Sequence, residues 1–143
     1  MLHLNLFGLR IAIACEDPAM RALIGANFSA FAATPSPAET PDLAYTVNHD
    51  VRGLTLRRGV AETANLWPGL DAGELIFLLE KDLTIEAQKH RPDLYFMHAA
   101  ALSYRDGAFL LIGRSGSGKS TTCWGLLHHG CGYLSDELAP IDL

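Results

Sequence analysis

The sequence predicts an α/β fold made of two regions that meet near residue 92, and two observations lead to this prediction. Before that point come short strand-like segments and two helix-like segments, which are typical of a small α+β region. After it, two apolar strands, a glycine-rich loop, a helix and another strand follow closely. We therefore expect an N-terminal α+β region over residues 1–91 and part of an α/β core over residues 92–143.

The composition is that of a globular protein without an affinity for nucleic acid. Of the 143 residues, 49% are hydrophobic and 19% are charged, so the chain is long and apolar enough to bury a core. The net charge is -5, and the 11 basic residues are scattered along the chain. Because no basic stripe is available to neutralise phosphates, we expect no nucleic-acid partner.

The cysteines and the apolar runs favour a cytoplasmic protein. Cys15, Cys123 and Cys131 are odd in number and lack the spacing of metal ligands, so we expect reduced thiols. No apolar run approaches the ~18 residues of a membrane span, and the N-terminus does not have the pattern of a signal peptide. We therefore expect neither a membrane segment nor secretion.

The first forty residues predict strands, a helix and a loop in that order. Leucines alternate with polar residues at the start and the apolar run "LRIAIAC" follows, which predicts one or two strands. Asp17 and Pro18 have the pattern of a helix N-cap followed by proline in the first turn, and this helix should reach about Phe31. "TPSPAETP", residues 34–41, predicts a loop by its composition.

Two strands and a long helix are predicted next. "DLAYTV" and "GLTLRR" have strand character and flank the turn-like "NHDVRG". In residues 71–90, Asp71 and Glu74 have the spacing of a capping box, and the apolar face is clear in the first half of the segment. We expect a helix there, ended by Pro92.

The remaining elements surround a glycine-rich loop. "LYFMHAAALSY" predicts one largely apolar strand, "RDG" a tight turn, and "AFLLIG" a second strand. With Arg105 opposite Ala108 in this hairpin, His98 would face Ser115. A helix should follow from about Lys119 to about Gly130, and "CGYL" predicts a short further strand.

The glycine-rich loop predicts a binding site for nucleotide phosphates. Gly113, Gly118, Lys119 and Ser120 fit the pattern G-x-x-x-x-G-K-[ST]. Glycines allow successive N–H groups to point inward at phosphate oxygens, the lysine reaches the β- and γ-phosphates, and the serine hydroxyl binds Mg²⁺. We therefore predict ATP and Mg²⁺ as ligands. The residues expected at the nucleotide are Gly113, Arg114, Ser115, Gly116, Ser117, Gly118, Lys119, Ser120 and Thr121.

Two acids and a histidine are candidate catalytic residues. Asp136 and Glu137 follow the strand "CGYL", and carboxyl ends of parallel strands meet at one edge of a sheet, so both acids should arrive beside the phosphates. One could share Mg²⁺ while the other takes a proton from an attacking hydroxyl. The alternatives are a solvated acidic turn for the two acids and a satisfied core residue for His98.

These motifs together resemble the HPr kinase/phosphorylase family and its HPr-kinase-related relatives. The matching stretches are "FMHAAALS", "GRSGSGKS", "LLHHG" and "YLSDE", within about residues 94–143. The intervals from His98 to Gly113 and from Ser120 to the acidic pair agree with those of the family. The resemblance implies a P-loop core of the phosphoenolpyruvate carboxykinase-like or HPr kinase-like type.

The resemblance also implies roles for individual residues. His98 and Lys119 would be active-site residues, Ser120 a magnesium ligand, and Glu137 the proton acceptor, with Asp136 beside it at the metal. The family enzyme has Asp-Asp where this chain has Asp-Glu. In this respect "SDE" looks more like the related kinases than like the enzyme that acts on the sugar-transport phosphocarrier.

The function implied is that of an ATP-dependent serine kinase that acts on a protein or peptide. The related kinases are hexameric, so a homo-oligomer is an associated expectation. The family's further metal-binding acid and acceptor-binding helix would lie beyond residue 143, so we expect an incomplete core that is inactive alone.

Two other functions remain open at this stage. "GRSGSGKSTT" also resembles the loop of ABC transporter ATPases, although an acidic pair 16 and 17 residues after Ser120 argues against that class. The third reading is a nucleotide-binding module without catalytic activity.

Overall fold

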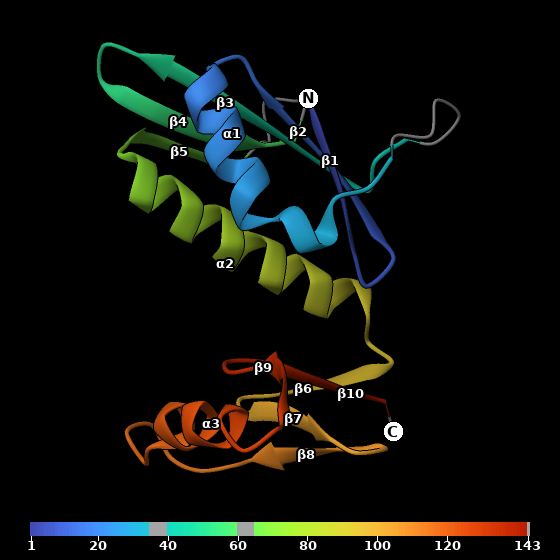
Figure 1. The fold of residues 1–143 in the computed structure, drawn as a ribbon. Helices are drawn as coiled ribbons and strands as arrows, with labels where there is room; N and C mark the ends of the chain where they lie inside the picture. Colours follow the sequence, from blue (N-terminus) through green and yellow to red (C-terminus); the bar gives the residue numbers. More distant parts are fainter. Residues whose placement is uncertain (35–39, 60–64, 143) are drawn as a thin grey trace. The chain divides into compact units, whose positions relative to one another are not determined.

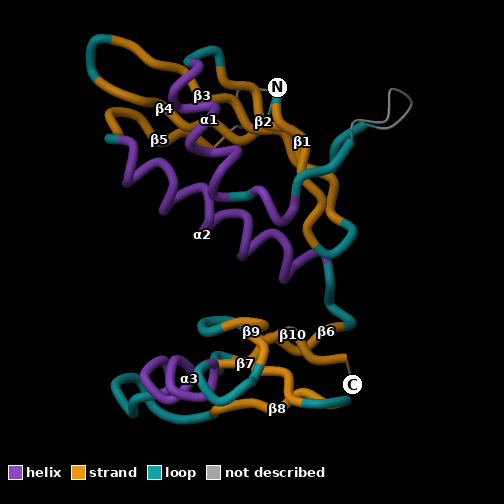
Figure 2. Tube along the Cα trace, viewed as in Figure 1, coloured by secondary structure: helices purple, strands orange, loops and turns teal. Residues whose placement is uncertain are grey.

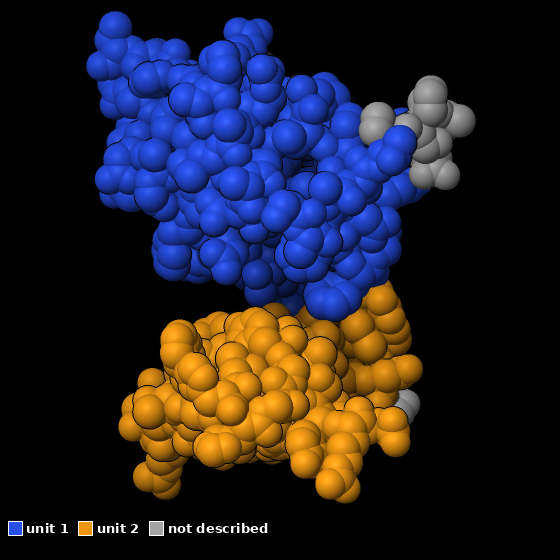
Figure 3. Space-filling model, viewed as in Figure 1, with its two compact units in different colours: residues 1–90 blue, residues 91–143 orange. Residues whose placement is uncertain are grey.

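The computed structural model describes residues 1–34, 40–59 and 65–142 and shows a mixed α/β protein with more strand than helix. The chain folds into two compact units, Met1–His90 and Arg91–Leu143 (Figure 1 and Figure 3). The sequence predicted a boundary one residue later. In the part of the chain that is described, no helix has both the length and the hydropathy of a membrane span.

A five-stranded sheet forms the first unit (Figure 2). Its order is β1–β2–β3–β4–β5, in which β2 and β3 are parallel and all other neighbours are antiparallel. The parallel pair is possible because helix α1 connects β2 to β3. The strands are β1 (Leu2–Leu6), β2 (Leu9–Cys15), β3 (Leu43–Asp50), β4 (Gly53–Arg58) and β5 (Asn65–Leu70).

The predicted strands of this sheet are confirmed, and β5 is an additional one. The turn between β3 and β4 is shorter than "NHDVRG", because β3 continues to Asp50. Strand β5 was not predicted because it contains Pro68 and Gly69, and both residue types favour turns. An edge strand tolerates proline because one side of it makes no ladder hydrogen bonds. Most of the loop predicted over residues 34–41 lies outside the described residues.

Helix α1 (Pro18–Asn27) begins as predicted. The Asp17 carboxylate accepts hydrogen bonds from the N–H groups of Ala19, at 2.8 Å, and Met20, at 3.0 Å, which confirms the N-cap. The helix ends four residues before the predicted position. The last of these residues form a separate 3₁₀ turn, Ser29–Phe31.

Helix α2 (Ala72–His90) begins with the predicted capping box. The Glu74 N–H donates to Asp71 Oδ1 at 2.8 Å, and the Asp71 N–H donates to Glu74 Oε2 at 2.9 Å. The buried face extends through the whole helix rather than its first half. The buried residues at its four-residue spacing are Leu75, Leu79, Leu83 and Ala87.

The core of the first unit lies between one face of the sheet and both helices. Side chains that are paired across the strands, such as Ile13 with Tyr45 and Val47 with Leu56, share this face. They form one buried cluster with residues of α1 and α2. Both helices therefore cover the same side of the sheet, which is the usual arrangement of an α+β unit.

A polar cluster joins the sheet to α2 at the border of this core. The Tyr45 hydroxyl donates to Asp82 Oδ2 at 2.7 Å, and Arg58 Nη1 lies 3.3 Å from the same oxygen and 2.5 Å from Glu86 Oε1. The Arg58 and Asp82 side chains are only 19% and 13% exposed. Burial, with the hydrogen bond to Asp82, raises the pKa of Tyr45 well above its usual range, so Tyr45 stays protonated as the donor.

A second sheet system forms the other unit. Strands β8 (Gly107–Leu111), β7 (Ala100–Tyr104) and β9 (Gly132–Ser135) pair in that order, with β7 antiparallel to both neighbours. Strands β6 (Leu94–Met97) and β10 (Ala139–Asp142) form a separate antiparallel pair. Helix α3 packs on the three-stranded sheet, where Cys123 meets Ala100 and Leu102 in a small buried cluster; α3 spans Lys119–Leu127.

Two details of this unit differ from the prediction. The single strand predicted over residues 94–104 is interrupted at His98 and Ala99, because β6 and β7 pair with different strands. The turn of the β7–β8 hairpin consists of Arg105 and Asp106, so Ala108 lies opposite Ser103 and the predicted register was wrong by two residues.

Loss of the Asp82 carboxylate should destabilise the first unit. In Asp82→Ala, Arg58 and the Tyr45 hydroxyl lose their shared partner in a largely buried place, so we expect the free energy of unfolding to fall by about 2–3 kcal/mol. The exposed residue Glu80 on the same helix provides the control, Glu80→Ala, with a change within about 0.5 kcal/mol. Urea unfolding followed by circular dichroism measures both, and an equal effect of the two variants would contradict a stabilising role of the cluster.

Candidate functional site

The topology of the second unit brings two strand ends to the same edge. Because β8 and β9 are both antiparallel to β7, which lies between them, they run in the same direction. The glycine-rich loop follows β8, and Asp136 and Glu137 follow β9. The sequence argument assumed a parallel sheet, and the antiparallel middle strand gives the two outer strands the same alignment.

The loop between β8 and α3 depends on glycine at defined positions. Gly118 is the N-cap of α3 and has a left-handed backbone conformation, with φ of 85°. At Gly113 an added Cβ would lie 2.6 Å from Ser117 Oγ, so the Ser117 side chain packs directly against the Gly113 backbone. The N–H of Ser117 donates to the carbonyl of Arg114 at 3.1 Å and tightens the turn.

Lys119 folds back across this loop. Its ammonium donates to the carbonyl oxygen of Gly113 at 3.1 Å and to that of Arg114 at 3.3 Å. Both are ordinary hydrogen bonds between a cation and a neutral acceptor. An anionic oxygen near the loop would be a stronger acceptor for this ammonium than either carbonyl.

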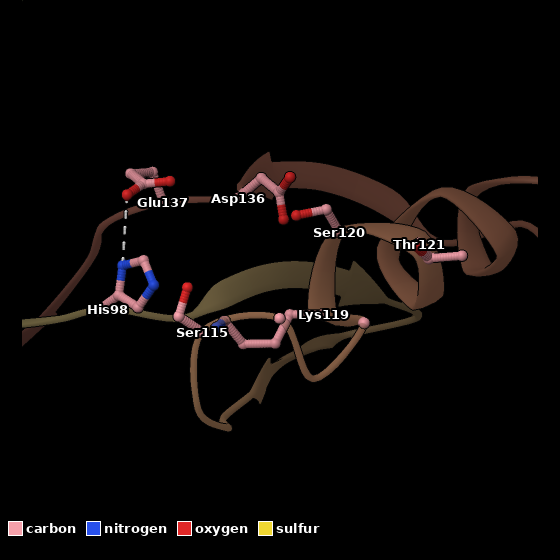
Figure 4. A pocket seen from close by; sticks show the side chains of 9 residues that line it. His98, Ser115, Lys119, Ser120, Thr121, Asp136 and Glu137 are labelled. Atoms are coloured by element: carbon pink, nitrogen blue, oxygen red, sulfur yellow. Dashed lines mark ion pairs between the residues drawn. The ribbon is translucent and has the colours of Figure 1, made fainter.

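Most of the predicted residues line one pocket of about 380 Å³ (Figure 4). Three segments that are far apart in the sequence contribute to it: the β6–β7 connection, the glycine-rich loop with the start of α3, and the residues after β9. The pocket is lined by His98, Ser115, Gly116, Gly118, Lys119, Ser120, Thr121, Asp136 and Glu137.

Three predicted loop residues do not line this pocket. Gly113 and Arg114 hold Lys119 through their carbonyl oxygens. Ser117 lies instead in a neighbouring hollow of about 310 Å³, which Lys119 also lines. Trp124 lines neither cavity.

Asp136 has an oxygen that lacks a partner. Its Oδ1 is buried, yet no hydrogen-bond donor reaches it in the part of the chain that the structure describes. Figure 4 shows its carboxylate turned toward the Ser120 hydroxyl. A buried carboxylate oxygen without a partner costs free energy, and a cation or a donor from a ligand would compensate for it.

The described residues offer few ligands to a metal ion. Across residues 1–34, 40–59 and 65–142, no group of three or more His, Cys, Asp or Glu side chains could hold one. A Mg²⁺ ion commonly takes one or two protein oxygens and completes its shell with water and phosphate oxygens. The Ser120 hydroxyl and the Asp136 carboxylate are suitable oxygen donors.

His98 and Glu137 form an exposed pair at the pocket. His98 Nδ1 lies 3.5 Å from Glu137 Oε1, and the two side chains are 53% and 88% exposed. This distance is that of a loose contact rather than a short hydrogen bond. Because Glu137 projects so far into solvent, its carboxylate is accessible to a hydroxyl group of another molecule.

No family model matches the chain, and no curated protein or solved structure matches it significantly. The likeness to HPr kinase/phosphorylase therefore rests on the motifs and their intervals.

The sequence analysis did not predict the structural role of Ser135, whose hydroxyl forms hydrogen bonds with both backbone groups of Leu138. The sequence did contain a signal for this turn, because a serine directly before the acidic pair can form hydrogen bonds with the backbone a few residues further on.

The sequence predicts that this loop binds ATP, and on that prediction substitution of Gly118 should weaken the binding. The left-handed conformation costs an alanine about 1–2 kcal/mol, so Gly118→Ala shifts the loop toward other conformations and is expected to reduce ATP affinity by up to about tenfold. An added Cβ has open space at both Gly118 and Gly125 of α3, so Gly125→Ala is a matched control for which affinity should not fall. Isothermal titration calorimetry measures both, and equal affinities would show that the loop conformation is not needed.

Proposed function

We propose that the protein binds Mg-ATP through residues 113–121 and transfers its γ-phosphoryl group to a serine hydroxyl of a protein or peptide. It would be a cytoplasmic serine kinase related to HPr kinase/phosphorylase, with a P-loop core. The observation that carries the proposal is the meeting of Lys119, Ser120, Asp136 and Glu137 in one pocket, from segments on both sides of β7.

The phosphate end of ATP fits the start of α3. The backbone N–H groups of the first helical turn make no hydrogen bonds within the helix, and the helix dipole favours negative charge at this end. Lys119 is already at the loop, held by two carbonyl oxygens. Exchange of these acceptors for phosphate oxygens would place its charge where negative charge develops during transfer.

Mg²⁺ would be held by the Ser120 hydroxyl and the Asp136 carboxylate. The support is the buried Asp136 oxygen, which no described residue pairs. When bound, the ion neutralises charge on the phosphate oxygens. One protein carboxylate and one hydroxyl are a sufficient set, since ATP and water supply the other ligands.

Glu137 is the best candidate for the general base. It is exposed, so an acceptor serine can approach it, and it lies in the same pocket as Lys119. The carboxylate would accept the hydroxyl proton while the oxygen attacks the γ-phosphorus, the bond from that phosphorus to the β,γ-bridging oxygen breaks, and ADP leaves. His98, 3.5 Å away, would be the neighbour that receives or stabilises this proton.

Removal of the lysine should abolish tight ATP binding. In Lys119→Ala we expect the affinity for Mg-ATP to fall 10- to 100-fold, because a charge-assisted contact to phosphate is lost. Lys89→Ala, which removes an exposed lysine of the other unit, should leave the affinity unchanged. Calorimetric titration of the 143-residue chain measures both variants, and wild-type affinity of Lys119→Ala would refute the phosphate site.

Glu137→Gln should separate binding from transfer. The amide keeps the size of the side chain but cannot accept the hydroxyl proton, so ATP affinity should stay within about twofold while transfer falls at least about 100-fold. The measurement follows the transfer of label from γ-labelled ATP to serine peptides. It uses a form of the protein for which the unaltered sequence transfers phosphate. Transfer by Glu137→Gln at the wild-type rate would refute the assignment of the base. Label that appears only as free phosphate would favour an ATPase.

A further inference from the structure

The segments that carry His98 and the two acids belong to one antiparallel ribbon that is interrupted once. In the β6–β10 pair Met97 lies opposite Ala139, and in the β7–β9 pair Ala101 lies opposite Ser135. From Met97 to Ala101 is four residues forward, and from Ala139 to Ser135 is four residues back. The register is therefore the same at the two pairs that flank the interruption, and three residues of each segment lie between them. One residue further along, between Ala101 and Leu102, a β-bulge or similar irregularity shifts the register of the β7–β9 pair.

Ser135 supplies hydrogen bonds in place of the missing ladder. Its Oγ donates to the carbonyl oxygen of Leu138 at 2.6 Å and accepts from the N–H of Leu138 at 3.3 Å. One side chain thus satisfies both backbone groups that Leu138 could otherwise offer to the opposite segment. The four-residue turn closed in this way contains only Asp136 and Glu137 between its ends.

The interruption matters because both acids line the same pocket. In a regular strand, successive side chains point to opposite faces of the sheet. Asp136 and Glu137 are neighbours in the sequence, so a continuous ribbon could direct only one of them to the pocket. Both line it here, and both lie inside the turn that Ser135 closes.

We propose that Ser135 is a positioning residue for the acidic pair, a role that rests on the proposed function. Its side chain does not line the pocket, so it acts through the turn and not on the ligand. Without the hydroxyl, the backbone of Leu138 is free to pair across the ribbon in the existing register. Residues 136 and 137 then return to alternate faces, and the Asp136 carboxylate leaves Ser120.

The test compares ATP binding with and without Mg²⁺ in the 143-residue chain. The affinity for ATP in EDTA reports on the loop and Lys119. The ratio of the affinity in Mg²⁺ to the affinity in EDTA, called here the enhancement by Mg²⁺, reports on Asp136. In Ser135→Ala we expect the metal-free affinity within twofold of wild type and the enhancement by Mg²⁺ reduced at least tenfold. Ser103→Ala, a serine at the other end of the β7–β9 pairing, should keep the full enhancement.

A second pair of variants isolates the hydroxyl. Threonine and valine have nearly the same shape, so Ser135→Thr should keep the enhancement by Mg²⁺ and Ser135→Val should lose it. The exchange rate of the Leu138 amide should change in the valine variant and stay as in the wild type in the threonine variant, because only valine removes the hydroxyl that accepts from this amide. If Ser135→Ala fails to fold, the threonine and valine variants still test whether the hydroxyl positions the acidic pair.

Three results would overturn the inference or its basis. Full enhancement by Mg²⁺ in Ser135→Val would overturn the positioning role while the proposed function stands. An equal loss of metal-free and Mg²⁺-dependent affinity would show a general structural role instead. If the unaltered chain does not bind ATP, the proposed function fails together with the role of Ser135, and slow exchange of the Leu138 amide would then show that the turn itself is real.

Discussion

The pairing of β7 with two neighbours at once is the constraint on which the candidate site depends. An antiparallel strand in the middle aligns β8 and β9 with each other, so whatever follows them emerges at one edge. The glycine-rich loop follows one strand and the acids follow the other. A pocket with a lysine on one side and two carboxylates on the other arises from this alignment rather than from proximity in the sequence.

Electrostatics explains why such a pocket suits a metal–phosphate ligand better than a neutral one. Lys119 and the first N–H groups of α3 present positive charge, while Asp136 contributes a carboxylate oxygen that no described donor satisfies. A ligand with phosphate oxygens at one end of the site and a divalent cation at the other would complement both.

Local signals in the sequence predicted much of the fold and the members of the pocket. The N-cap Asp17, the capping box of α2 and the glycine-rich loop are local, because each depends on side chains three or four positions apart. The interruption at His98 could not be predicted in this way. The run through residues 94–104 is largely apolar, and the break arises because its two halves pair with different partners. Strand β5 was missed since its proline is tolerated only at an edge.

The equal spacing within the ribbon has a consequence for how this segment can evolve. Three residues separate the Met97–Ala139 and Ala101–Ser135 pairs on each side, so the parity of the pleat is preserved between these two pairs, and the register shifts just beyond them, between Ala101 and Leu102. A substitution in this stretch leaves the number of residues between the two pairs unchanged. A single-residue insertion or deletion would instead invert every side chain of the strand that follows, exchanging its interior and exterior faces. Gene lineages that carry this segment should therefore conserve its length.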